Sequence, residues 1–271
     1  MPTRINADHR PHDPLPLKDR RRANKQKNAK PGRPLPAPVP RVPATHGWYP
    51  PCKAVLERAA ALILLVLGGP LILGLALLIK LTSRGPAFYT QTRLGRHAVP
   101  FTIYKLRTMM NKCESLTGPR WSMPGDPRVT PLGRFLRASH LDELPQLINV
   151  LRGDMSLIGP RPERPEFLPE LERACPRYRE RLEVRPGVTG LAQVQLPADT
   201  SVDSVRRKLA YDLYYISHLS PWLDVALVLC TGFYAMGLPF GLVGRILRVP
   251  HGEKVEGEMK DVLQEAGRAA A

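Results

Sequence analysis

The chain has 271 residues, and its 40 Lys and Arg against 24 Asp and Glu give a formal net charge of +16. This length accommodates one or two domains, and a hydrophobic share of 43% excludes a chain that is disordered throughout. The four cysteines form no C-x-x-C pair, which excludes a zinc finger or a disulfide scaffold and favours a reducing compartment. The basic excess leaves nucleic acid, anionic lipid and phosphorylated substrates open as partners.

The first 53 residues are basic and rich in proline. They carry 12 Lys and Arg against three Asp, a net charge of +9, and they hold 12 of the 30 prolines. Because proline fixes φ and removes a backbone donor, this composition predicts a disordered tail. A tether to anionic lipid is the functional alternative, and the segment lacks the order of a signal peptide.

Residues 59–79 contain no charged side chain, and 21 residues of straight helix just cover a hydrocarbon core of about 30 Å. The sequence therefore predicts a membrane segment. Gly68, Gly69 and Pro70 weaken the helix at its centre, and Lys or Arg residues flank both of its ends. Because basic flanks favour the cytoplasmic face, a re-entrant segment bent at Gly69 and Pro70 is preferred modestly over a single span with a kink.

The rest of the chain predicts an α+β, mainly helical fold. β-Branched and aromatic residues at 88–90 and 99–104 indicate a short β-hairpin. Helices are expected from residue 131 and over 145–151, 167–182 and 203–218. The apolar stretch 221–243 contains Asp224, Gly232, Gly237 and Pro239, so we expect it to lie in the membrane interface as an amphipathic helix.

Asp142 and Glu143 directly precede a predicted helix whose first turn begins at Pro145. Free backbone N–H groups at a helix start favour ionised carboxylates and bound phosphate. Adjacent side chains point in different directions, which excludes a glycosidase pair. One carboxylate could instead attack a phosphate while the other binds a metal ion. An ordinary helix cap accounts for the same dipeptide, so the dipeptide alone leaves both interpretations open.

Arg161 lies between Pro160 and Pro162, which fix the backbone on either side of it. A guanidinium presented in this way is suited to bidentate phosphate contacts, although a surface turn accounts for the same residues. Arg137 precedes the carboxylates by five residues, and Arg185 opens a glycine-rich turn. That turn lacks the Gly-Lys-Ser/Thr of a phosphate-binding loop.

Five sequence blocks occur in a fixed order: GPAFYTQTRLG at 85–95, FTIYKLRTM at 101–109, LDELPQL at 141–147, GDMSLIGPRP at 153–162 and RPGVTGLAQV at 185–194. Together they resemble the bacterial sugar transferase family, the monotopic phosphoglycosyl transferases that make polyprenyl-diphosphate sugars. The resemblance covers roughly residues 52–240. It implies a re-entrant helix bent at a proline, which Pro70 matches here.

The resemblance also implies a set of roles for individual residues. Asp142 matches a nucleophile that attacks the sugar-bearing phosphate of a UDP-sugar, releases UMP and carries an aspartyl-phosphosugar, which polyprenyl (undecaprenyl) phosphate then attacks. Glu143 matches the dyad partner, and both carboxylates are expected at Mg²⁺. Arg137 and Arg161 are expected to bind phosphate. Further residues in family blocks, with substrate-binding and structural roles both open, are Lys105, Arg107, Arg185 and Asp212.

The expected organisation follows from the pattern and the resemblance together. It is a basic tail at 1–53, a re-entrant membrane helix at 54–81, a cytoplasmic catalytic region at 82–245 and a polar tail at 246–271. The expected location is the cytoplasmic face of a bacterial inner membrane. UDP-sugar, polyprenyl phosphate and membrane lipids are the expected partners, with homo-oligomerisation left open.

Two positions depart from the family pattern. Family members commonly continue from Val194 with Asn-Gly-Arg, whereas this chain continues with Gln195, Leu196 and Pro197, and His140 stands where a small hydroxyl residue is usual. The first departure keeps an inactive membrane scaffold open as an alternative. A membrane-anchored nucleic-acid-binding protein is the other alternative, but no helix-turn-helix, RNA-recognition or finger pattern supports it.

Overall fold

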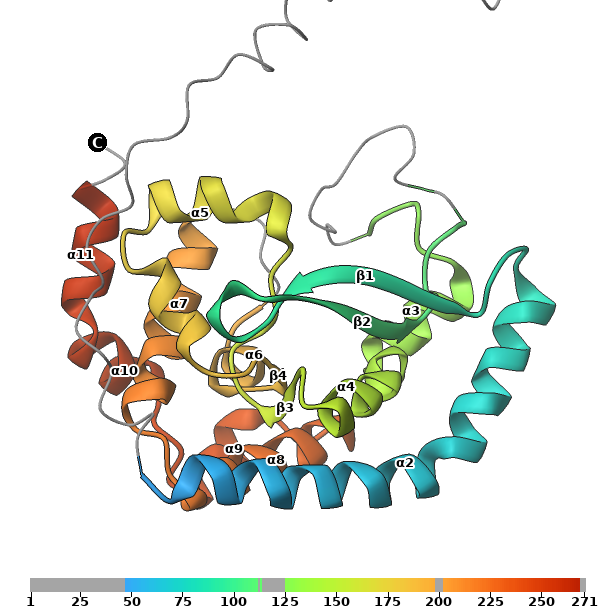
Figure 1. Cartoon of the computed structure of the whole chain (residues 1–271), viewed down its shortest axis with the longest axis horizontal. Helices are drawn as coiled ribbons and strands as arrows, with labels where there is room; N and C mark the ends of the chain where they lie inside the picture. The colour runs from blue at the N-terminus through green and yellow to red at the C-terminus, as the bar shows by residue number, and fades with distance from the viewer. Residues whose placement is uncertain (1–46, 112, 114–124, 198–201, 269–271) are drawn as a thin grey trace, which may run out of the picture. The chain divides into compact units, whose positions relative to one another are not determined.

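The computed structural model describes residues 47–111, 113, 125–197 and 202–268 (Figure 1). Most of the predicted basic tail, residues 1–46, lies outside the described residues. The first helix among the described residues begins at Tyr49, inside the segment that the sequence assigned to the tail.

The first described helix, α2 (Tyr49–Thr82), is 34 residues long and has Pro70 in its interior. Figure 1 shows a bend in its middle, with the two arms running in different directions. A proline inside a helix removes one backbone hydrogen bond and clashes with the carbonyl four residues earlier, which explains a bend. The predicted broken helix is thus a continuous but bent one. We call residues 49–69 its N-terminal arm and residues 71–82 its C-terminal arm.

Both arms of α2 pack against the remainder of the fold. The N-terminal arm buries Ala61 completely in a cluster with Ile103, Leu147, Val150 and Met155. The C-terminal arm contributes Ile72, Leu75, Ala76 and Ile79 to a second cluster with Ala87, Leu106 and Leu136. The bent helix is therefore held at both ends by one folded unit.

The predicted hairpin is confirmed by strands β1 (Phe88–Leu94) and β2 (Pro100–Leu106), which pair antiparallel with Phe88 opposite Leu106. The short helix η2 (Arg96–Ala98) connects them. The helix expected from residue 131 is α3 (Pro131–Ala138), and its first turn is capped by the Thr130 hydroxyl, which accepts a 3.0 Å hydrogen bond from the Gly133 amide.

The region expected to hold a helix from Pro145 is built differently. A 3₁₀ helix, η3 (Leu141–Gln146), contains Pro145 and leads directly into α4 (Leu147–Arg152). The second helix ends at Gly153, whose φ of 84° is the left-handed conformation that favours glycine. Asp142 and Glu143 therefore lie inside a helical turn rather than in front of one.

Two three-residue strands that the sequence did not predict, β3 (Ser156–Ile158) and β4 (Gly187–Thr189), pair in parallel. The chain between them was expected to form one helix over 167–182. It forms three short pieces: η4 (Pro165–Phe167), α5 (Leu168–Ala174) and η5 (Tyr178–Glu183). Cys175 is extended, with φ −136° and ψ 94°, because a residue before proline disfavours the helical conformation and Pro176 follows.

The C-terminal half is helical and centres on α7 (Val202–Ser217), which confirms the helix expected over 203–218. Around it lie α6 (Leu191–Gln195), α8 (Pro221–Ala235), α9 (Phe240–Ile246), α10 (Gly252–Glu258) and α11 (Lys260–Arg268). The segment 246–271, predicted as a polar tail, differs most from expectation. Val255 on α10 and Val262 on α11 are buried in the same core as Tyr211 and Tyr215 of α7.

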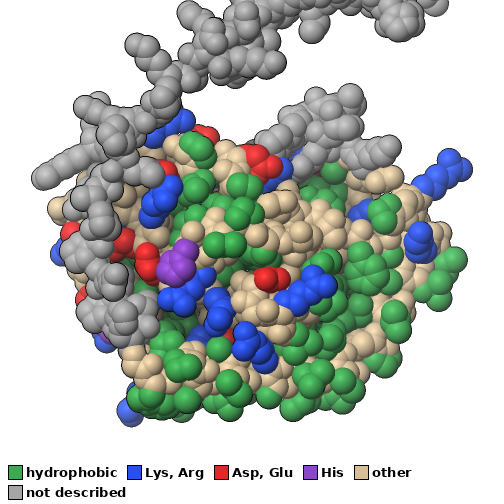
Figure 2. All heavy atoms as spheres, in the orientation of Figure 1, with side chains coloured by type: hydrophobic (Ala, Val, Ile, Leu, Met, Phe, Trp, Pro, Cys, Tyr) green, Lys and Arg blue, Asp and Glu red, His purple; other side chains and the backbone are tan. Residues whose placement is uncertain are grey.

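A large set of exposed hydrophobic side chains belongs to α2, α8 and α9. Leu67 is 73% exposed, Trp222 58% and Ile246 71%. Figure 2 shows hydrophobic side chains gathered along the lower edge, where Figure 1 places the N-terminal arm of α2. Among the described residues, α2 alone is long and apolar enough to cross a membrane by length and composition. Exposed apolar surface of this extent indicates a lipid or protein contact.

Candidate active site

The two carboxylates predicted to carry the chemistry lie on η3, which packs against β2 and against the C-terminal arm of α2. A left-handed residue, His140 with φ 56°, turns the chain between α3 and η3, and its carbonyl accepts a hydrogen bond from the Glu143 amide. Both side chains are buried: Asp142 is 7% exposed and Glu143 is 9% exposed. Two adjacent acids in this position require compensating charge.

The compensating charge on Glu143 comes from two cations on separate elements. Lys105 of β2 donates a 2.7 Å hydrogen bond from Nζ to Oε1 of Glu143. Arg161, in the loop after β3, donates from Nη2 to the same oxygen at 2.6 Å and from Nη1 to Oε2 at 3.3 Å. Burial alone raises the pKa of Glu143, but the attraction and hydrogen bonds of these cations outweigh it and hold that pKa well below its usual value.

Asp142 has different surroundings, although it is the next residue in the chain. Burial and the neighbouring charge of Glu143 raise its pKa, while the charges of Lys105, Arg137 and Arg161 act in the opposite direction. Within the described ranges its carboxylate makes no hydrogen bond or ion pair with another side chain. The two acids thus differ: Glu143 is held by two cations, and Asp142 makes no such contact among the described residues.

The backbone of the Arg161 loop is fixed from two sides. Arg181 of η5 donates a 2.8 Å hydrogen bond to the Arg161 carbonyl, and Arg93 of β1 donates to the Pro162 carbonyl at 3.1 Å. Arg181 is itself paired with Asp212 of α7 at 2.8 Å, and both are buried. Asp212 therefore reaches the site indirectly, through Arg181 and the loop backbone.

Three glycines allow this loop to sit against β4. A Cβ on Gly187 would lie 2.1 Å from the Gly159 amide nitrogen, and one on Gly190 would lie 2.2 Å from the Gly159 carbonyl oxygen. These distances are too short for any side chain. Hydrogen bonds from the Gly159 amide to Thr189 and from the Gly187 amide to Pro160 complete the contact. The close backbone approach accounts for the glycines in two of the sequence blocks.

The remaining predicted site residues lie in three different places. Arg137 of α3 donates a 2.8 Å hydrogen bond to the Thr108 hydroxyl, and its charge acts on Asp142. Arg107 donates to the carbonyls of Ser83 and Arg84, at the C-terminal end of α2. Arg185 lines a separate cavity with residues of the N-terminal arm, described below. The structure thus assembles Lys105, Asp142, Glu143 and Arg161 with Arg137 nearby, and it places Arg107 and Arg185 elsewhere.

A model of the bacterial sugar transferase family matches residues 48–237, which is more than half of the chain and includes every element of this site. The chain belongs to the bacterial sugar transferase family. The match begins one residue before α2 and ends just after α8, so α10 and α11 lie outside it.

Several curated bacterial sugar transferases are similar to the chain. A UDP-N-acetylgalactosamine-undecaprenyl-phosphate N-acetylgalactosaminephosphotransferase of Aeromonas hydrophila is 43% identical over 197 residues, which cover 73% of this chain and 44% of that protein. A UDP-glucose:undecaprenyl-phosphate glucose-1-phosphate transferase of Caulobacter vibrioides is 49% identical over 183 residues, covering 66% and 67%. The enzyme of that name in Escherichia coli is 37% identical over 204 residues, covering 72% and 43%. The chain thus spans less than half of two of these relatives.

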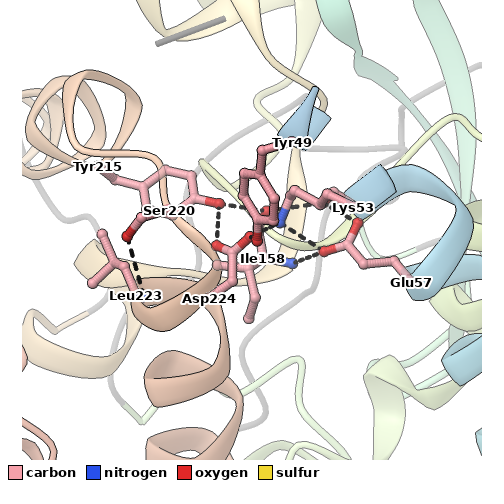
Figure 3. A network of polar contacts seen from close by, with 9 residues as sticks. Tyr49, Lys53, Glu57, Ile158, Tyr215, Ser220, Leu223 and Asp224 are labelled. Carbon is pink, nitrogen blue, oxygen red and sulfur yellow. Dashed lines mark hydrogen bonds and ion pairs between the residues drawn. The ribbon is translucent and has the colours of Figure 1, made fainter. Parts of the chain in front are cut away.

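A polar network near the start of α2 was missed by the sequence reasoning (Figure 3). Lys53 bonds to Glu57 at 2.8 Å and to Asp224 of α8 at 2.5 Å. Asp224 also accepts hydrogen bonds from the hydroxyls of Tyr49 and Tyr215. Glu57 accepts from the Ser156 hydroxyl and the Ile158 amide of β3, the strand that leads into the Arg161 loop. The sequence carries two signals of this network. Lys53 and Glu57 form an i, i+4 charge pair beside an apolar helix, and Asp224 is an acid within an apolar stretch.

The two carboxylates of the site suit a divalent cation that takes most of its ligands from substrate and water. Mg²⁺ in such sites takes one or two carboxylates and fills its other positions with substrate phosphates and water. Asp142 and Glu143 supply two carboxylates, and the described residues contain no group of three potential ligands. The donor set therefore suits an ion that arrives with a phosphorylated substrate rather than one held in a protein cage.

The two departures from the bacterial sugar transferase pattern have structural counterparts. Gln195 ends α6 and donates a 2.9 Å hydrogen bond to the Pro250 carbonyl, so it connects α6 to the segment before α10. His140 holds the left-handed turn before the dyad and lies 6.1 Å, centroid to centroid, from the Tyr234 ring. Residues 198–201, which follow the first departure, lie outside the described residues.

Proposed function

We propose that this protein transfers a sugar 1-phosphate from a UDP-sugar to polyprenyl (undecaprenyl) phosphate and releases UMP. The observation that supports this most is the asymmetric dyad. Buried Asp142 has no side-chain partner among the described residues, while Glu143 beside it is held by Lys105 and Arg161. One carboxylate is free to act as a nucleophile, and cations for phosphate charge are already in place.

In the first step an Asp142 carboxylate oxygen attacks the sugar-bearing phosphorus of the UDP-sugar. A carboxylate–phosphorus bond forms, and the bond from that phosphorus to the bridging oxygen breaks. The electron pair leaves with the bridging oxygen, which becomes part of the UMP phosphate. Arg161 is 46% exposed along its side chain, so its guanidinium can face substrate while it still contacts Glu143.

In the second step an oxygen of polyprenyl phosphate attacks the phosphorus of the aspartyl-phosphosugar. The bond to Asp142 breaks, the carboxylate is restored, and the sugar leaves as a polyprenyl-diphosphate sugar. Lys105 and Arg161 hold Glu143 in one orientation through both steps, which keeps the site organised between the two substrates. When bound at this dyad, Mg²⁺ offsets negative charge on the transferred phosphoryl group.

The acceptor is a lipid, so the site has to work at a membrane surface. The exposed hydrophobic residues of α2, α8 and α9 support a membrane contact on one side of the fold. We assign α2 as a re-entrant helix and place the dyad on the cytoplasmic face of a bacterial inner membrane, where surface polysaccharide assembly begins. The basic flanks at both ends of the apolar stretch support that orientation.

The test follows UMP release by protein reconstituted in nanodiscs with Mg²⁺, undecaprenyl phosphate and a panel of UDP-sugars. UDP-glucose and UDP-N-acetylgalactosamine come first, because the similar curated proteins are named for those donors. We expect one donor to give UMP at a rate that falls at least 10³-fold in Asp142→Asn, the order expected for loss of a covalent nucleophile. No Asp142-dependent UMP with any donor contradicts the proposal. Polysaccharide that persists in cells carrying Asp142→Asn indicates a scaffold instead.

A further inference from the structure

A cavity opens away from the dyad, where the N-terminal arm of α2 meets β3 and the chain before β4. It encloses about 480 Å³, including space open to solvent. Arg96 and Arg185 line it from one side, Lys53 and Glu57 from another, and Pro50, Ala54 and Leu219 provide apolar surface. None of the four residues gathered at the dyad lines this cavity.

The charges around this cavity are unbalanced. Burial lowers the pKa of Arg185, the charges of Arg58 and Arg96 act in the same direction, and the charge of Glu57 opposes them. Within the described ranges, neither Arg58 nor Arg185 makes a hydrogen bond or ion pair with another residue. Arg96 uses its Nε on the Glu183 carbonyl, a neutral group. Three cations, Lys53, Arg96 and Arg185, therefore line the cavity against the single carboxylate of Glu57.

The one carboxylate in the cavity wall is occupied by other partners. Glu57 is already engaged by Lys53, by the Ser156 hydroxyl and by the Ile158 amide, and Lys53 is shared with Asp224 (Figure 3). These groups satisfy one another within their own network. The arginines beside the network remain available to an external anion.

The arm of α2 that lines the cavity also carries exposed apolar side chains. Val55, in the same helix as Arg58, is 65% exposed, and Leu62, one turn beyond Arg58, is 53% exposed. Figure 2 shows Lys and Arg side chains gathered on the face in view, just above the hydrophobic lower edge. A ligand that satisfies both features carries an anionic group and an apolar chain.

We propose that Arg96 and Arg185 form a binding site for the phosphate of an anionic membrane phospholipid, whose acyl chains follow the exposed side chains of the N-terminal arm. The proposal rests on the membrane contact in the proposed function. The acceptor polyprenyl phosphate has to bring its phosphate to Asp142, and the dyad does not line this cavity. A structural lipid fits the position better than a substrate does. The site anchors the start of α2 to the anionic leaflet.

The test measures lipid retention rather than activity. The full chain is purified from nanodiscs that contain phosphatidylcholine and the anionic lipid phosphatidylglycerol, and transferred to detergent. Native mass spectrometry then counts protein ions that keep one phosphatidylglycerol. We expect Arg96→Gln/Arg185→Gln to lower this fraction roughly 30-fold, because each arginine near an anionic surface contributes about fivefold. The matched control is Arg173→Gln/Arg179→Gln, which removes two exposed arginines of α5 and η5 and should retain lipid like the unaltered chain.

Three results would overturn the proposal. The first is equal retention in the arginine variant and the unaltered chain, with matching thermal unfolding to show that both are folded. The second is retention of undecaprenyl phosphate, but not of phosphatidylglycerol, that depends on these arginines. The third is binding of soluble glycerol phosphate as tight as that of the lipid. Asp142→Asn should retain lipid unchanged, so a failure of the transferase proposal is separate from a failure of this one.

Discussion

Asp142 and Glu143 are neighbours in the chain, yet their electrostatic surroundings are opposed. Two cations hydrogen-bond directly to Glu143 and overcome the effect of its burial on its pKa. The same cations make no hydrogen bond to Asp142 and act on it only through their charge. Burial and the charge of Glu143 outweigh that effect, so the pKa of Asp142 is raised. Proteins that need two acids in different roles commonly separate their pKa values in this way.

The pH dependence of UMP release follows from that balance. In the proposed mechanism Asp142 has to be ionised to attack, so we expect activity to fall as pH falls through its raised pKa. The charge of Arg137 lowers this pKa, and Arg137→Gln should move the acid limb of the kcat/KM profile to higher pH. Arg137→Lys keeps the charge and should leave the limb near its original position. A limb that is the same in Arg137→Gln and the unaltered protein would show that Asp142 does not set it.

Lys53 of α2 bonds to Glu57 on the same helix and to Asp224 of α8, and both carboxylates are almost buried. The side chains of Lys53, Glu57 and Asp224 are 11%, 13% and 9% exposed. Lys53→Met leaves two acids close together without their cation, and we expect the free energy of unfolding to fall by about 3–5 kcal/mol. Lys260→Met, at an exposed position of α11, should stay within about 0.5 kcal/mol. Thermal or denaturant unfolding in detergent measures both, and equal stability of the two variants would refute a stabilising role for the network.

At the scale of elements, β3 and β4 can pack together because Gly159 and Gly187 have no side chains. Gly187→Ala places a Cβ within 2.1 Å of the Gly159 amide, so the two strands have to separate. We expect a loss of about 1–3 kcal/mol of stability. We also expect a larger proportional loss of activity than of folded protein, because Arg161 is two residues from Gly159. UMP release per folded molecule, measured beside the melting temperature, separates these effects.

The matched control for that variant is Gly232→Ala, near the C-terminal end of α8. A Cβ at Gly232 meets nothing within 4 Å, and alanine is favoured over glycine inside a helix by roughly 0.5–1 kcal/mol. This variant should be as stable as the unaltered chain or slightly more so, with full activity. Comparable losses in both variants would indicate that glycine is required generally rather than for the contact between β3 and β4.

The sequence was informative about elements wherever a local rule decided them. β-Branched and aromatic residues predicted the β1–β2 hairpin, and apolar residues on one helical face after Pro131 predicted α3. Strands β3 and β4 are three residues each, too short for any periodicity to show, and their pairing joins residues about 30 positions apart. Within the site, the dyad and Arg161 lie in recognisable blocks. Arg181 could not be predicted, because it acts on a backbone carbonyl that only the fold brings to it.

At the scale of the whole molecule, the bend of α2 is fixed by contacts at both ends. The N-terminal arm packs on Ile103 and Met155, and the C-terminal arm packs on Leu106 and Leu136. A straight helix cannot make both sets of contacts at once. Straightening would therefore expose one cluster, while the proline removes the hydrogen bond that would oppose bending.

The last prediction concerns the two sides of the membrane. If α2 is re-entrant, both of its ends face the cytoplasm. Two variants each carry one labelling position: Cys113→Ser leaves Cys52, and a variant without Cys52 and Cys113 carries Thr82→Cys. Both positions should resist an impermeant maleimide in intact cells and react with it in inverted vesicles. Replacing Gly68, Gly69 and Pro70 by leucine removes roughly 3 kcal/mol of proline penalty and ~1 kcal/mol per glycine, which favours a straight spanning helix. That variant should place the two labelled positions on opposite sides and lose activity with the dyad intact. Labelling of Cys52 from outside in the unaltered helix, with Thr82→Cys protected, would show that α2 spans the membrane.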